Sequence, residues 1–99
     1  MDEKLARVTK ARLEYYDLLK ESTEAKLELY RSMRNHAMEL SDKLEGLVDL
    51  AKEDVDFYNS RCRKANINFN VWDSRVNSVK RDITKIEKAK LSLRLLKSQ

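Results

Sequence analysis

Apolar side chains recur with coiled-coil spacing along the second half of the chain. If Val55 is counted as position a of a heptad, the intervals alternate between three and four residues as far as Leu93. Only Lys90 and Lys97, at late a positions, interrupt the pattern. A repeat kept over this length predicts a long helix that packs along a narrow seam. The expected helix-seam interface consists of Val55, Tyr58, Cys62, Ala65, Phe69, Trp72, Val76, Val79, Ile83, Ile86 and Leu93.

Two apolar stripes with helical spacing run side by side along the first half. The first stripe comprises Leu5, Val8, Tyr15, Leu19, Leu29, Met33 and Leu40, with Arg12, Ser22, Lys26 and His36 as interruptions. The second stripe comprises Leu13, Tyr16, Leu27, Tyr30 and Ala37. A helix with one neighbour needs only one narrow seam. Two stripes therefore predict that the first helix contacts more than one partner, as in a bundle.

The chain reversal is predicted at residues 41–46. Asp42, with Glu45 three residues later, resembles a capping box, and Gly46 enters left-handed backbone without steric cost. We therefore expect one helical domain over residues 1–99, with helices at about 3–40 and about 46–97. Two consecutive intervals of four residues, at Ala51, indicate a local unwinding of the coiled coil in this interpretation.

Residues 66–70 offer a second place for a break. Three of these five residues are Asn, which is a poor helix former and a good helix cap. A break here predicts a three-helix bundle whose last helix begins near Asn70. Because Ala65, Phe69 and Trp72 keep the heptad phase across the segment, we favour an all-α fold, a long antiparallel helical hairpin or coiled coil that assembles into a helical bundle.

Composition excludes several classes of protein. The chain has 99 residues, one Gly and no Pro, which is too few turn formers for a sandwich or barrel and too few Gly for a phosphate-binding loop. Cys62 and His36 are the only residues of their kinds, so multi-cysteine zinc sites and di-metal bundle sites are excluded. We expect Cys62 to be a small apolar filler and His36 a half-buried structural residue. No catalytic residues, cofactor or metal are predicted, and hence no enzyme.

Charge is distributed unevenly along the chain. The net charge is +4, but residues 1–50 carry nine basic and eleven acidic side chains, whereas residues 51–99 carry twelve and six. Arg81, Lys85 and Lys88 are spaced four and three residues apart and line one outer helical stripe, a candidate site for anions or lipid headgroups. Nucleic acid is not favoured as the ligand, because no aromatic side chains for base stacking interleave with these cations.

The pattern predicts a non-enzymatic coiled-coil interaction or assembly module. Through its heptad seam and the wide face of the first helix, the chain would dimerise or join a helical partner subunit in a larger complex. The alternative function is a peripheral binder of anionic membrane surfaces that uses Arg81, Lys85 and Lys88. Because the sequence has neither a long apolar run nor a signal peptide, we expect a cytoplasmic or nuclear protein that is not secreted and has no transmembrane segment.

Overall fold

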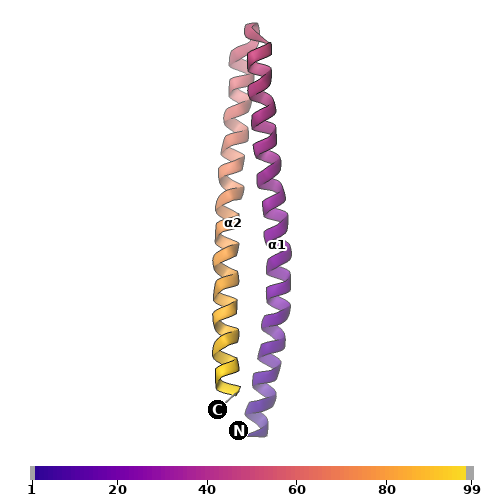
Figure 1. The fold of residues 1–99 in the computed structure, drawn as a ribbon, viewed down its shortest axis with the longest axis vertical. Coiled ribbons are helices and arrows are strands. Elements are labelled where there is room, and N and C mark those ends of the chain that lie inside the picture. The colour runs from indigo at the N-terminus through magenta and orange to yellow at the C-terminus, as the bar shows by residue number, and fades with distance from the viewer. Residues whose placement is uncertain (1, 98–99) are drawn as a thin grey trace. The chain divides into compact units, whose positions relative to one another are not determined.

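The fold is an antiparallel helical hairpin, which confirms the predicted all-α class. In the computed structural model, which describes residues 2–97, α1 spans Glu3–Leu50 and α2 spans Val55–Lys97. A short 3₁₀ helix, η1 (Lys52–Asp54), connects them, and the described residues contain no strand. Figure 1 shows the chain reversing its direction at this connection.

The start of α1 follows from the side chain of Asp2. Its carboxylate accepts a hydrogen bond from the backbone N–H of Lys4 at 3.3 Å, and its carbonyl oxygen accepts one from Ala6 at 2.9 Å. These are the contacts of a helix N-cap, which satisfies amide groups that have no partner within the first turn. Glu3 adds an acidic side chain in that turn, where the helix dipole favours negative charge.

The predicted reversal at 41–46 is wrong, because these residues lie inside α1. The chain turns instead at Ala51, where φ is −105° and ψ is 71°. Its N–H still bonds to the carbonyl of Leu47 at 2.8 Å, and its own carbonyl accepts the N–H of Asp54 at 3.1 Å. No described residue has positive φ, so the turn needs no glycine. The two intervals of four residues at Ala51 mark this reversal and not an unwound coiled coil.

The break considered at 66–70 is absent, and α2 continues through all three Asn residues. The amide oxygen of Asn66 accepts a hydrogen bond from the Ser41 hydroxyl at 2.8 Å. One of the three Asn residues therefore serves a contact between helices, and the segment does not end a helix. The three-helix alternative is thereby excluded.

Gly46 lies in mid-helix, and a Cβ added there would meet no atom within 4 Å. We therefore expect Gly46→Ala to raise the free energy of unfolding by about 0.5–1 kcal/mol, the difference in helix propensity between the two residues. Urea denaturation followed by circular dichroism measures this change. Ala25→Gly, at an exposed position of α1, is the reverse control and should lower the stability by a similar amount. If Gly46→Ala instead lowered the stability, this would indicate that the chain reverses its direction at Gly46.

The described hairpin is treated as two compact units. Unit 1 joins the residues up to Leu27 with those from Ser78 onward, and unit 2 is Glu28–Asn77. Each unit pairs a segment of α1 with a segment of α2, and unit 2 contains the reversal.

Candidate helix-docking surface

The predicted seam of α2 faces α1 of the same chain. In unit 2, Cys62, Ala65 and Val76 are buried, and Val55, Tyr58, Phe69 and Trp72 are half-buried. In unit 1, Val79 and Ile86 are buried, and Ile83 and Leu93 are half-buried. Because this burial arises within a single chain, the seam is already occupied before any partner binds.

Only one of the two stripes of α1 faces α2. The buried or half-buried positions of α1 include the second stripe and also polar residues: Thr9, Leu13, Tyr16, Lys20, Thr23, Leu27, Tyr30, Arg34, Ala37, Ser41, Leu44 and Val48. Their intervals alternate between four and three residues, as in the a and d positions of a heptad. The seam of α1 is therefore regular throughout, but several of its members are polar and were not recognised from apolar periodicity.

Polar contacts across the seam fix the register within unit 2. Arg34 Nη1 donates to Asp73 Oδ1 at 3.3 Å, and one heptad further along α1 the Ser41 hydroxyl bonds to Asn66. A step of one heptad forward on α1 thus matches a step of one heptad back on α2. A shifted pairing would separate both contacts, so these side chains select one antiparallel register.

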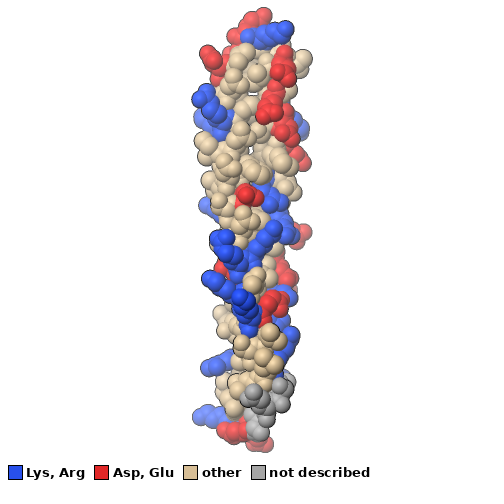
Figure 2. All heavy atoms as spheres, turned by 60° about the vertical axis from the view of Figure 1, so that its left-hand side comes forward, with Lys and Arg blue, Asp and Glu red and all other residues tan. Residues whose placement is uncertain are grey.

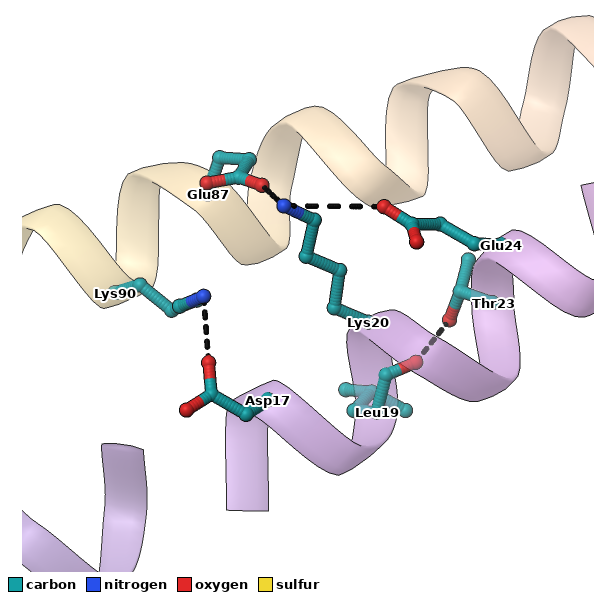
Figure 3. Close-up of polar contacts among 7 residues, drawn as sticks. All are labelled: Asp17, Leu19, Lys20, Thr23, Glu24, Glu87 and Lys90. Atoms are coloured by element: carbon teal, nitrogen blue, oxygen red, sulfur yellow. Dashed lines mark hydrogen bonds and ion pairs between the residues drawn. The ribbon is translucent and has the colours of Figure 1, made fainter. Parts of the chain in front are cut away.

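Ion pairs cross the seam of unit 1 in the same way (Figure 3). Lys90 Nζ lies 2.6 Å from Asp17 Oδ1, and Lys20 pairs with Glu87 across the seam and, at 3.8 Å, with Glu24 within α1. The hydrogen bond from Lys90 lowers the pKa of Asp17, and that from Lys20 lowers the pKa of Glu87. The bond to Glu87 raises the pKa of Lys20. Lys90, which interrupts the apolar pattern, is thus a buried cation with a carboxylate partner.

Because of these pKa shifts, the free energy of unfolding should be constant at intermediate pH and should decrease at both acidic and alkaline pH. The lowered pKa values of Asp17 and Glu87 stabilise the fold above their ordinary values of 3.8 and 4.5, and this contribution disappears as pH falls through the lowered values. The raised pKa of Lys20 stabilises the fold below 10.5 and ceases to do so as pH rises further. Urea midpoints measured across this range should show both falls. Lys20→Gln should remove the alkaline fall, and an unchanged profile would contradict the Lys20–Glu87 pair.

The first stripe of α1 points away from α2. Its members have the seam spacing shifted by one residue, which turns the stripe by about 100° around the helix. In unit 1, Leu5, Val8 and Tyr15 are exposed, whereas Leu19 is half-buried. In unit 2, the exposed members are Leu29 (59%), Met33, Leu40 (45%) and, in the same spacing, Leu47; we call these four residues the unit 2 stripe. Among the described residues, exposed large apolar side chains outnumber buried apolar ones.

The unit 2 stripe is bordered by cations from α2. The guanidinium of Arg75 lies 4.6 Å from the ring centre of Trp72 and 6.0 Å from that of Tyr30 on α1. Arg61 lies 5.0 Å over the ring of Phe57. Both arginines occupy the g position of the α2 heptad. The contact with Tyr30 places this side of α2 beside the side of α1 on which the stripe lies.

Unit 1 has a shallow groove on the corresponding side. It has a volume of about 450 Å³ and is lined by Arg12, Tyr15, Tyr16, Ala89, Ser92 and Leu93. The two tyrosine rings contact each other edge to face at 5.3 Å between their centres. The groove shows that the first stripe of α1 and the neighbouring side of α2 form one continuous surface in this unit.

The three predicted anion-binding residues are exposed on α2 in unit 1. Arg81, Lys85 and Lys88 take part in none of the ion pairs found among residues 2–97. Figure 2, which brings the side of α2 forward, shows Lys and Arg side chains gathered there. These cations therefore face solvent and are available to an external ligand.

The remaining candidates offer no chemical site. Cys62 is buried in the seam, and His36 is exposed, not half-buried as predicted, because its position lies on the outward stripe. In the described part of the chain, no group of His, Cys, Asp or Glu side chains could hold a metal ion. No helix there has a stretch apolar enough to cross a bilayer.

Comparison with known proteins gives no match to a family model, to a curated protein or to a solved structure.

Proposed function

We propose that the chain is a non-catalytic assembly module that binds a helical partner through the outward stripe of α1. The single observation behind this proposal is the second heptad pattern on α1. The first pattern packs against α2, whereas the second leaves large apolar side chains exposed. Exposed apolar surface of this kind marks an interaction site, and its spacing of three and four residues matches the seam of a partner helix.

The α2 seam is not the docking surface in this proposal, because α1 of the same chain already covers it. The unit 2 stripe takes that role. Its four side chains and their neighbours offer an area on the order of several hundred Å² per partner, near the lower end of stable interfaces.

The proposal is tested by site-specific photocrosslinking in cells. A benzophenone amino acid replaces Leu40 on the stripe or, as the matched control, Ile67, which is exposed on another side of unit 2 (61%). We expect adducts of discrete mass from position 40 but not from position 67, and their loss when Met33→Glu is added. Equal labelling at the two positions, or none at position 40, would contradict the proposal.

A second candidate function is weak binding to anionic membrane surfaces through Arg81, Lys85 and Lys88. Their solvent exposure and absence from ion pairs support this function. Each cation near an anionic bilayer contributes about 1 kcal/mol, so binding should be weak and sensitive to salt. In co-sedimentation with vesicles containing phosphatidylserine, Arg81→Glu with Lys85→Glu should abolish binding. Binding that persists in this variant would rule out the patch.

A further inference from the structure

We infer that the partner at the unit 2 stripe is an amphipathic helix of another protein, with carboxylates along one flank of its apolar seam. The inference rests on the proposed function. It adds that the partner is another protein and that its helix has an acidic flank. Its basis is the charge around the stripe.

The stripe side of unit 2 carries cations and no carboxylate at the heptad positions that form it. If Tyr30 is counted as position d and Arg34 as position a of α1, the c and g positions of α1 form this side: Leu29, Met33, His36, Leu40, Lys43, Leu47 and Leu50. On α2, they are Phe57, Arg61, Lys64, Asn68, Val71 and Arg75. The opposite side of the seam is different, because there Arg34 is already paired with Asp73. An apolar seam bordered by unpaired cations is complementary to a helix with an acidic flank.

Arg61 and Arg75 are held in place without a carboxylate. Their guanidinium groups lie over aromatic rings, and neither arginine joins the ion pairs found among the described residues. A guanidinium stacked on a ring keeps the N–H groups at its edge available for a carboxylate. Its restricted motion also reduces the entropy lost on binding. The aromatic contacts therefore position two donors beside the stripe.

The same charges disfavour a second copy of this chain. A two-fold dimer places the same patch of each copy in contact. Arg61, Lys64 and Arg75 of one copy would then approach the same cations of the other. Neither copy offers a carboxylate at the c or g positions of this side to offset the repulsion.

A flat anionic membrane also fits this side less well than a helix does. Beyond the stripe, the outer surface of α1 carries Glu28 and Glu39, which lie in one shallow depression with Arg31 and His36 and outnumber its one Arg. These carboxylates would approach the lipid headgroups along with the stripe. A helix avoids them by presenting its acidic flank only toward α2.

The test uses the full chain and two designed helical peptides with the same leucine seam, one with Glu and one with Lys along the flank. Dissociation constants are measured by fluorescence anisotropy at about 50 mM and about 500 mM salt. We expect the Glu peptide to bind about tenfold more tightly at low salt, with a smaller difference at high salt, as for a few exposed ion pairs.

Variants separate charge from packing. Arg61→Gln with Arg75→Gln should remove most of the preference for the Glu peptide, whereas Arg63→Gln, exposed on another side of α2, should not. Lys64→Glu changes a residue that has no aromatic contact, so it tests the charge even if the double arginine variant is unstable. It should weaken binding of the Glu peptide and strengthen binding of the Lys peptide. Leu40→Glu should reduce binding of both peptides.

The outcomes distinguish the two proposals. If both peptides bind equally and Leu40→Glu prevents binding, the acidic partner is overturned while the assembly function stands. If neither peptide binds, both proposals are overturned. If sedimentation shows a homodimer that Leu40→Glu dissociates, the partner is a second copy of the chain and not an acidic helix. If the chain binds phosphatidylserine vesicles and the double arginine variant abolishes this binding, the partner is a membrane.

Discussion

Val76→Ala is expected to lower the free energy of unfolding by about 2–3 kcal/mol. Val76 is 0% exposed in the seam of unit 2. The substitution removes two buried methyl groups, worth roughly 1.6 kcal/mol by transfer, and leaves a cavity that adds to this loss. A chain of this size has a total stability of only about 5–15 kcal/mol, so the loss is a large fraction. Urea denaturation followed by circular dichroism measures it.

Val71→Ala is the matched control for this prediction. It removes the same atoms from the same helix, but Val71 is 43% exposed on the outer side of α2. We expect a change within about 0.5 kcal/mol, since no cavity forms and alanine is the better helix former. Similar losses at positions 71 and 76 would show that α2 does not pack along the proposed seam.

The seam of α2 could be predicted because the regular spacing of its apolar residues identifies which positions face α1. From Val55 to Leu93, the apolar residues keep one phase, and all of those named as seam residues are buried or half-buried. Lys90 occupies its regular a position in this seam although its side chain is charged. The pattern of positions was thus more informative than the polarity of any one side chain.

The position of the reversal could not be predicted from the usual turn signals. Gly46 is a glycine without positive φ, and Asp42, the predicted cap, lies inside α1 next to Ser41, a buried donor to Asn66. The actual turn at Ala51 has negative φ (−105°) with ψ of 71°, and neither Gly nor Pro occurs in it. The available signal was the pair of four-residue intervals at Ala51, which is compatible with an unwound coiled coil as well as with a reversal.

The choice between the two stripes of α1 depends on both helices together. Both stripes have the same period, so the sequence of α1 alone does not decide which one meets α2. The structure packs the stripe that holds Ala37 and Ser41 against the α2 seam, whose buried residues include the small Cys62 and Ala65. Small residues on both helices allow close packing, and this match is invisible to the periodicity of either helix alone. The larger Leu and Met side chains remain outside and form the candidate site.

Lys90→Leu is expected to raise the free energy of unfolding by about 1–2 kcal/mol. Lys90 is only 6% exposed, so its ammonium group has lost much of its hydration, and the contact with Asp17 offsets only part of that cost. Leucine at this position buries an apolar side chain in the seam of unit 1. Asp17 is 60% exposed on its side chain and stays hydrated when its partner is removed. Thermal and urea denaturation measure the gain, and Lys88→Leu, at an exposed position, should change stability by less than about 0.5 kcal/mol.

The same substitution should reduce the specificity of pairing. A polar residue at a single a position selects register and oligomeric state at a cost in stability. Without Lys90, the seam of unit 1 loses a contact that holds α1 and α2 in one antiparallel register, while its apolar surface increases. Sedimentation of Lys90→Leu should therefore show additional oligomers at concentrations where the natural chain shows a single species. If Lys90→Leu were less stable than the natural chain, the Asp17–Lys90 pair would be a net source of stability. If Lys90→Leu formed only a single species, the remaining polar contacts would be the ones that select the register.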